Sequence, residues 1–525
     1  MSQMLKSSSS MAAATFTSRL LGLVRVQVYG LFMGTTAVAG AFALAFMIPN
    51  LFRRLLGEGA LAAAFIPIFK HKEKLEGEAE MWRAANAVIS GLFIVASVLT
   101  ALAMLGITVA LSVHSFDEET RLMLRLLRTM FPYMLLICLT AVFMGMLNAR
   151  GHFFVPAMGA VVLNLVMIAS VFWLTPHFGA TLETRIFGLA VGVLVAGLAQ
   201  ALFQLPNLRR DGFRFQWVSP WRNATVRTVV QKMVPGTLGV AAFQMNVMIT
   251  QSLAFGQNAP IVSVFDYAVR LMEFPQGVFG ISLATFLLPT LSGLAAEKKF
   301  DDFRSTLGQG LGYLIFINLL ASVLLMTLAE PIVRLLFQYG HRFGPLSTAS
   351  VSRALVFLAP GLLAFSMTNI LARAFYALGD VQTPMRISIL CLGVNLVLTV
   401  LFLIILKLGA AGLGLANTMT SWLNVSILLF ALRKKLKRLD LGALRGQLPV
   451  LVPLGLLAGL LAWGISMAWQ AQFGHQAVWA RFGEVFVPAA IAGSAYVGGC
   501  WWLRIAAARE VVTALRGKVR WERSS

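Results

Sequence analysis

The chain has 525 residues, of which 58% are hydrophobic and only 12% are charged, and its mean hydropathy is +0.80. Soluble domains carry about 25% charged residues, so the composition excludes an ordinary soluble protein, and the recurring long apolar runs indicate an all-α polytopic membrane protein. The formal charge of +22 would suit nucleic acid, but Lys and Arg gather in the loops of one side. That pattern indicates membrane topology rather than nucleic-acid binding.

The apolar runs predict about fourteen membrane-spanning helices, because each span needs about 20 apolar residues. The first run is interrupted by arginines and lacks a small-residue cleavage site, so we expect a retained first helix rather than a signal peptide. The expected spans lie near residues 10–34, 36–60, 84–113, 122–149, 153–177, 185–206, 224–255, 262–291, 303–328, 347–377, 383–408, 409–432, 446–470 and 482–507.

The connections between these spans alternate in charge. One set contains KHKEKLEGE (70–78), LRKKLKRLD (432–440) and the basic C-terminal tail, and it holds most of the Lys and Arg. By the positive-inside rule this set is cytoplasmic, which places both termini in the cytoplasm and requires an even number of helices. The basic residues assigned to the other side are Arg121, Arg185, Arg334, Arg342, Lys407 and Arg481.

Two proline-containing landmarks recur at nearly one offset. Pro67 and Pro289 are 222 residues apart, each after an apolar run and before a charged one, and Pro156 and Pro384 are 228 apart in LNARGHFFVP and FYALGDVQTP. A chance match of turns is the alternative. A true repeat predicts two parallel six-helix lobes around a central cavity that alternate by rocking.

The repeat sets the expected domain organisation. We place an N-lobe at 1–215, a C-lobe at 216–440, two further helices at 441–510 and a basic cytoplasmic tail at 511–525. The two further helices lie outside the repeat, so they must have another task.

Six arginines lie near the predicted apolar cores of the spans. A charge near the bilayer centre costs roughly 2.5–3.5 kcal/mol, so several survive only if they face a wet cavity or pair with another group. The sequence therefore predicts a cationic cavity within the membrane and an anionic cargo. The arginines are Arg19, Arg25, Arg53, Arg54, Arg270 and Arg373.

Four of these arginines form the candidate binding site. Arg19 and Arg25 lie in the first helix, Arg53 in the second, and Arg270 in the second helix of the C-lobe. Planar guanidinium groups bind phosphate oxygens bidentately, so arginines from both lobes could hold a pyrophosphate on the central axis. The alternative is that these side chains extend to the membrane interface or form structural ion pairs. This alternative is strongest for Arg53, which lies near a helix end.

Neighbouring polar residues complete the candidate site. Ser18 shares a helix face with Arg25, seven residues away. Glu273 follows Arg270 by three residues and could be its ion-pair partner, a gate or a cation ligand. Asp380 is expected to cap the helix or turn that follows it.

No catalytic or metal-binding signature is present in the sequence. It holds no nucleophile elbow, no phosphate-binding loop and no cluster of His, Asp and Glu. Cys138, Cys391 and Cys500 lie far apart in apolar runs, which favours packed free thiols over a metal site or disulfides. We therefore expect a transporter rather than an enzyme, with no catalytic residues, no metal ligands and no cofactor.

Several segments together resemble the MurJ/MviN family of bacterial lipid II flippases, members of the MOP exporter superfamily. The resemblance covers nearly the whole chain. The matching segments are SRLLGLVR (18–25), AFMIPNLFRRLLGEGALAAAFIPIF (45–69), VRLMEFPQGVFGISLATFLLPTLS (269–292), LFQYG (336–340) and AFYALGDVQTP (374–384).

The resemblance implies a fold and a function. It implies two six-helix lobes with a V-shaped cavity, and translocation of undecaprenyl-pyrophosphate-linked disaccharide pentapeptide from the cytoplasmic to the periplasmic leaflet of the inner membrane. It further implies a place in peptidoglycan synthesis, lipid II, membrane lipids and the cell-wall synthesis machinery as partners, and a coupling ion or the membrane potential as the energy source.

The resemblance also implies residue roles. Positions matching Arg19, Arg25 and Arg270 bind the pyrophosphate, and those matching Arg53 and Glu273 are functionally important. The helices at 446–507 would form a groove for the polyprenyl tail.

The chain departs from the family where many relatives carry charges. Val26, Gly40 and Val269 stand where acidic residues are common, and Met47 where a basic one is. Coupling through those carboxylates is therefore in doubt, and Glu58 and Glu273 are the nearest candidates left.

Three other functions remain open at this stage. The same fold could export another polyprenyl-linked glycan or a drug, although a cationic drug would require an acidic cavity. A membrane glycosyltransferase would require acidic metal ligands or a catalytic base. A non-transporting scaffold would be expected to lose the cavity arginines.

Overall fold

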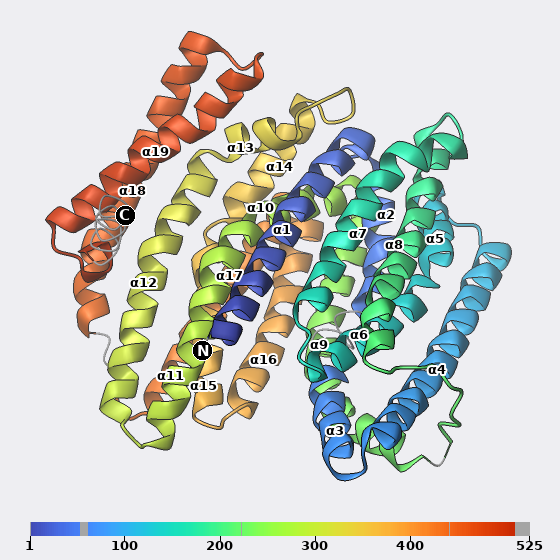
Figure 1. Cartoon of the computed structure of the whole chain (residues 1–525). Coiled ribbons are helices and arrows are strands. Elements are labelled where there is room, and N and C mark those ends of the chain that lie inside the picture. The colour runs from blue at the N-terminus through green and yellow to red at the C-terminus, as the bar shows by residue number, and fades with distance from the viewer. Residues whose placement is uncertain (1, 53–60, 222, 440–441, 510–525) are drawn as a thin grey trace. The chain divides into compact units, whose positions relative to one another are not determined.

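The computed structural model describes residues 2–52, 61–221, 223–439 and 442–509, and within these ranges every regular element is a helix (Figure 1). The expectation of an all-α protein is thus confirmed. The chain forms two compact units, residues 1–263 and 264–525. The lobe boundaries expected near 215 and 440 stay predictions.

Helices of the first unit pack side by side against one another. Contacts join α1 to α7, α2 to α5, α6 to α8, and α9 to α2, α3 and α4. The unit contains α1 (Ser2–Met33), α2 (Ala37–Phe52), α3 (Leu61–Leu75), α4 (Glu78–Val113), α5 (Glu118–Met130), α6 (Tyr133–Ala149), α7 (Phe154–Trp173), the 3-10 turn η2 (Thr175–Phe178), α8 (Leu182–Arg210) and α9 (Ala224–Gln257).

The second unit adds a helical hairpin to a similar series. The hairpin helices α18 and α19 pack on each other, and α12 packs on α18. The elements are α10 (Pro260–Pro275), which crosses the unit boundary, the π-helix η3 (Gln276–Ile281), α11 (Ser282–Ala296), α12 (Phe300–Thr327), α13 (Ala329–Phe337), α14 (Pro345–Leu358), α15 (Gly361–Ala377), α16 (Gln382–Thr399), the π-helix η4 (Val400–Ile405), α17 (Ala410–Lys435), α18 (Gly442–Phe473) and α19 (Val478–Trp502).

The described residues contain eight helices long and apolar enough to span a membrane, or ten if two bent pairs each count as one span. The bends interrupt the predicted spans at 122–149 and 347–377. The first lies between α5 and α6 and measures 42°, and the second lies between α14 and α15 and measures 44°. The chain is a multi-pass membrane protein, and the number fourteen stays a prediction.

Local geometry supports the internal repeat. The two bends occur at Pro132 and Pro360, which are 228 residues apart. The same offset relates Gly151 to Gly379, whose φ angles are 87° and 74°. Each glycine ends a helix in the left-handed conformation that glycine adopts without steric cost.

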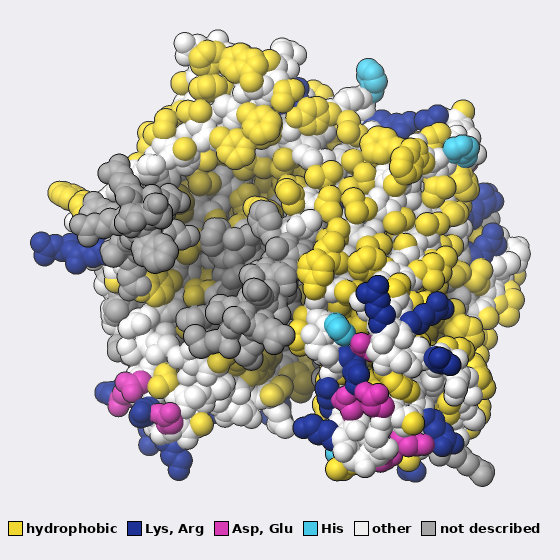
Figure 2. Space-filling model, in the orientation of Figure 1, with side chains coloured by type: hydrophobic (Ala, Val, Ile, Leu, Met, Phe, Trp, Pro, Cys, Tyr) yellow, Lys and Arg dark blue, Asp and Glu magenta, His cyan; other side chains and the backbone are white. Residues whose placement is uncertain are grey.

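Hydrophobic side chains cover much of the described surface in Figure 2, and Lys, Arg, Asp and Glu gather mainly toward its lower edge. The helix α4 illustrates this pattern, because Leu102 and Leu105 are 59% and 61% exposed. Contiguous exposed apolar surface of this extent suits a bilayer rather than water.

Two smaller expectations are confirmed. The thiols of Cys138, Cys391 and Cys500 are buried and free. Asp380 caps the turn that begins α16, because one carboxylate oxygen accepts a hydrogen bond from the backbone N–H of Thr383 at 3.0 Å.

Candidate cargo-binding site

Helix α1 carries Ser18 and Arg19 and is held against α7. The side-chain amide of Asn164 on α7 donates a hydrogen bond to the backbone carbonyl of Ser18 at 3.0 Å. Asn164 is 5% exposed, and a polar amide buried at this depth is stabilised by such a bond. The contact fixes the α1 segment that presents Arg19, whose side chain is partly exposed.

Arg25 lies two turns further along α1 and contacts the first of three aromatic rings that lie in a row. Its guanidinium lies 5.7 Å from the ring centroid of Tyr29, one turn later, within the range of a cation–π contact. Tyr29 meets Phe42 of α2 edge-on at 6.1 Å, and Phe42 stacks on Phe46 at 6.1 Å. The position of Arg25 is therefore coupled to the packing of α1 on α2.

Arg270 on α10 is part of a partly exposed ion-pair cluster. Its Nη1 donates to Glu273 Oε2 at 2.9 Å, as the three-residue spacing predicts. Its Nη2 lies 3.5 Å from Asp266 Oδ1. The Arg270 side chain is 34% exposed, so the guanidinium is accessible to an anion that displaces a carboxylate.

Asp266 is a functional candidate that the sequence analysis missed. The signal was available, because Asp266 precedes Arg270 by four residues and i, i+4 positions share a helix face. Its 45% exposed side chain adds an acid to a region that we expected to be poor in acids.

The structure explains one departure from the family. A Cβ atom on Gly40 of α2 would lie 1.9 Å from the backbone carbonyl oxygen of Ala259. Any side chain there would collide with backbone, so the usual carboxylate cannot be accommodated in this arrangement. Val26 is likewise buried, at 5% exposure, where a carboxylate would require a partner.

The remaining site predictions divide into two groups. Arg53 and Glu58 lie outside the described residues. Ser18, Arg19 and Arg25 lie together on α1 in the first unit, whereas Arg270 and Glu273 lie on α10 in the second. Their convergence on one cavity stays a prediction.

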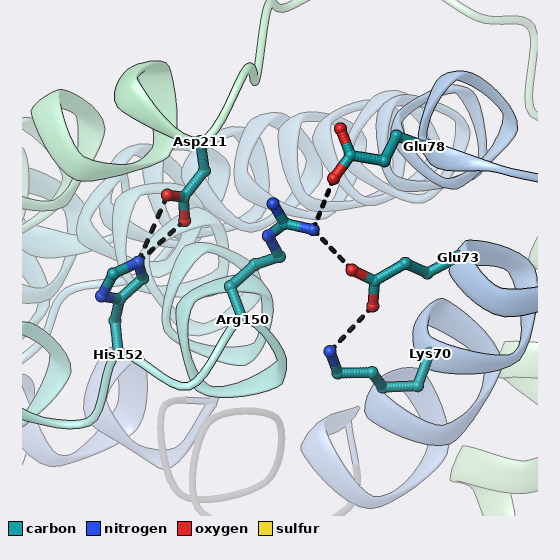
Figure 3. Close-up of polar contacts among 6 residues, drawn as sticks. All are labelled: Lys70, Glu73, Glu78, Arg150, His152 and Asp211. Carbon is teal, nitrogen blue, oxygen red and sulfur yellow. Dashed lines mark hydrogen bonds and ion pairs between the residues drawn. The ribbon is translucent and has the colours of Figure 1, made fainter. Parts of the chain in front are cut away.

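A separate ion-pair network in the first unit joins the end of α3, the start of α4 and the turn after α6 (Figure 3). Arg150 Nη1 bonds Glu73 Oε1 at 2.5 Å and Glu78 Oε1 at 2.8 Å, and Lys70 Nζ bonds Glu73 Oε2 at 2.8 Å. The hydrogen bond from Lys70, supported by the charge of Arg150, lowers the pKa of Glu73. The network ties α3 and α4 to the turn after α6.

Beside this network, His152 Nε2 lies 3.1 Å from Asp211 Oδ2 (Figure 3). This contact ties the same turn to the end of α8. The charged groups lie near the ends of α3, α4 and α8 and in the turn after α6, and their contacts tie these segments together, which indicates a structural role.

A buried ion pair holds the terminal hairpin of the second unit. Arg334 of α13 donates from Nη1 to Glu484 Oε1 of α19 at 2.6 Å, and their side chains are 7% and 1% exposed. Glu330, 59% exposed, bonds the other terminal nitrogen of Arg334 at 2.5 Å. Arg334 lies in the short helix α13, between the long helix α12 and the bent pair α14 and α15.

Comparison with known proteins decides the family. The family model "Lipid II flippase MurJ" matches residues 31–482. The chain belongs to the MurJ family. A lipid II flippase MurJ of Burkholderia cenocepacia is 33% identical over 466 residues, covering 87% of this chain and 89% of the relative.

Further relatives agree with this MurJ assignment. A probable lipid II flippase MurJ of Vibrio cholerae is 32% identical over 489 residues, covering 88% of this chain and 92% of the relative. A solved MurJ structure in an inward closed conformation superposes with a TM-score of 0.75 at 22% identity, over 92% of this chain and 98% of that one. An inward-facing MATE family transporter of the MOP superfamily gives a TM-score of 0.66 at 16% identity, over 82% and 98%. These structural likenesses identify the fold as that of MOP transporters.

Proposed function

We propose that this chain is a lipid II flippase, which carries the undecaprenyl-pyrophosphate-linked peptidoglycan precursor from the cytoplasmic to the periplasmic leaflet by alternating access. The observation that carries the proposal is the MurJ family match over residues 31–482. The all-helical, multi-pass fold supports it, and the protein is a transporter rather than an enzyme.

We propose that Arg19, Arg25 and Arg270 bind the pyrophosphate, with Arg53 as a further contact. Guanidinium groups match phosphate oxygens in charge and geometry. Arg270 is already paired with carboxylates, so cargo binding would be an exchange in which phosphate replaces Glu273 or Asp266. Such an exchange lets the site release its cargo when the carboxylates return.

The two carboxylates that face Arg270 can leave it at little cost. Asp266 and Glu273 together carry two negative charges against the single charge of Arg270, and both side chains are nearly half exposed. They are solvated when the phosphate displaces them, so the displacement does not strand a buried charge. Ser18 and Glu58 remain candidate gating contacts.

We propose that the membrane potential or an ion gradient supplies the energy. An inward-negative potential favours outward movement of an anion by ~2.3 kcal/mol per charge per 100 mV. The pyrophosphate carries the charge on which this field acts.

We propose that the protein lies in the bacterial inner membrane with both termini in the cytoplasm, because the connections at 70–78 and 432–440 hold three and five Lys and Arg residues, and these residue types gather in cytoplasmic loops. The hairpin of α18 and α19 lies outside the repeat and exposes large apolar side chains such as Leu457 and Leu460. We propose that it holds the polyprenyl tail and that the cell-wall synthesis machinery receives the cargo.

The direct test is complementation of a bacterial strain depleted of its own lipid II flippase, with surface-exposed lipid II assayed. We expect the wild-type chain to restore growth, cell shape and lipid II exposure. Arg270→Ala at the same membrane level should restore none of them, whereas Arg353→Ala, an exposed arginine of α14, should act like wild type. Failure of the correctly inserted wild-type chain would refute the function, and activity of Arg270→Ala would refute the site.

A further inference from the structure

The helix α5 carries three arginines on one face. Arg121, Arg125 and Arg128 follow the i, i+4, i+7 spacing, so they lie within a narrow stripe along the helix. The opposite face is apolar and buried, with Leu126 and Leu127 inside the unit where α5 packs on α2 and α8. The arginine face is therefore the side of α5 that points away from the packed core of the unit.

The arginine stripe lacks carboxylate partners among the described residues. No ion pair within 4.0 Å joins any of the three arginines to a described Asp or Glu. Asp117, the nearest acid at the helix start, instead accepts the backbone N–H of Thr120 at 3.0 Å, which lowers the pKa of Asp117. The stripe therefore presents three guanidinium groups that no described carboxylate neutralises.

The helix beside the stripe, α4, exposes an apolar face. Arg128 Nη1 donates to Thr108 Oγ1 of α4 at 3.3 Å, which places the last arginine of the stripe next to that helix. Residues 91–113 of α4 contain no charged side chain. Large apolar side chains on one face of this segment, Leu102, Leu105, Val109 and Val113, are 59%, 61%, 49% and 80% exposed. The arginine stripe suits the charged headgroup of an anionic phospholipid, and the exposed apolar face of α4 suits its acyl chains.

The repeat shows that the stripe is not required by the fold. The equivalent helix α14 has a bend of similar size but only one of the three arginines. At the offset of 228 residues, Arg125 corresponds to Arg353, whereas Arg121 and Arg128 correspond to Ala349 and Val356.

We propose that the stripe Arg121–Arg125–Arg128 binds the phosphate headgroup of an anionic glycerophospholipid, whose acyl chains lie along α4. The lipid would lie in the periplasmic leaflet, which follows from the orientation proposed above. Binding of the headgroup itself does not depend on that orientation. Guanidinium forks bind phosphodiester oxygens bidentately, and each basic residue near an anionic surface strengthens binding about fivefold.

The test uses the purified full chain in phosphatidylcholine nanodiscs that contain a photoreactive phosphatidylglycerol. We expect crosslinks to map to 102–113 of α4 and to α5. Arg121→Gln/Arg125→Gln/Arg128→Gln should reduce crosslinking there by tenfold or more, and Arg353→Gln should leave it unchanged. Excess phosphatidylglycerol should compete, and phosphatidylcholine should not.

Three results would overturn the proposal. They are wild-type crosslinks that avoid α4 and α5, undiminished crosslinking in a triple variant with a normal thermal unfolding curve, and competition by undecaprenyl pyrophosphate but not by phosphatidylglycerol. The last result would reassign the stripe to the cargo. Wild-type mapping and competition decide the question even if the triple variant does not fold, and neither depends on flippase activity.

Discussion

The turns at Gly151 and Gly379 share a backbone geometry but are held by different side-chain contacts. In both, the residue after glycine donates its N–H five residues back, from His152 to Leu147 and from Asp380 to Phe375, each at 2.9 Å. In the first unit the side chain after glycine is a histidine that contacts an aspartate, and in the second it is an aspartate that bonds a lysine. The repeat therefore conserves backbone geometry, while each unit holds its turn with its own side-chain contact.

The second unit also has a buried ion pair between Arg334 and Glu484, and Glu484 lies in the hairpin outside the repeat. Loss of this pair should lower the free energy of unfolding more than any other change considered below. Glu484→Ala leaves the buried Arg334 with only the exposed Glu330 of its two carboxylate partners. Breaking a buried pair costs 3–5 kcal/mol, and we expect about 3 kcal/mol from denaturant unfolding in detergent. Glu330→Ala, which removes an exposed partner, should cost less than about 1 kcal/mol. Equal effects would show that burial is irrelevant to this contact.

The shared turn predicts matched losses in the two units. Gly151→Ala and Gly379→Ala should each cost about 1–2 kcal/mol, because an L-residue is strained at positive φ. A Cβ atom at either glycine would meet nothing within 4 Å, so the penalty is conformational and should be equal. Gly106→Ala, in helical backbone with equally open space, should cost nothing. Thermal unfolding of the three variants checks this, and a loss at only one turn would contradict the repeat.

The ion pair of the second turn predicts a pH dependence. The hydrogen bond from Lys435 lowers the pKa of Asp380 from 3.8 to about 2. A depressed pKa stabilises the fold above pH 3.8, and that contribution is lost as the pH falls toward 2. The pair is partly exposed, so the loss should be below about 1 kcal/mol. Asp380→Asn should show a smaller decrease in melting temperature between pH 5 and pH 3 than wild type, and an unchanged decrease would disprove the assignment.

The smallest effect should come from giving the first unit the ion pair of the second. His152→Asp with Asp211→Lys reproduces the arrangement of Asp380 and Lys435. We expect stability within about 0.5 kcal/mol of wild type, as for most surface changes. His152→Asp alone, which faces two carboxylates toward each other, should be less stable than the double variant. If the double variant were less stable than His152→Asp alone, the surroundings of the first turn would exclude the Asp–Lys arrangement.

Local sequence patterns predicted the elements well. Apolar length located the long helices, and the prolines at 67, 289, 156 and 384 predicted a repeat that the matched bends and turns support. The three-residue spacing of Arg270 and Glu273 predicted their ion pair. The matched bends at Pro132 and Pro360 share the same offset and could have been found in the same way.

Contacts between distant segments could not be predicted. Arg334 and Glu484 are 150 residues apart, and no local pattern relates them. The same holds for Gly40, whose requirement for glycine arises from the close approach of Ala259. Such features depend on how helices pack, which periodicity along one helix does not specify.

The most direct test of the central claim is translocation of lipid II by the purified chain in liposomes. Lipid II would be loaded in both leaflets, and its accessibility to an added external enzyme would be followed after a membrane potential is imposed. The account predicts that wild type makes the inner-leaflet lipid II accessible, that Arg270→Gln does so at least tenfold more slowly, and that Arg353→Gln matches wild type. Equal rates for wild type and Arg270→Gln, or no translocation by a correctly folded wild-type chain, would contradict it.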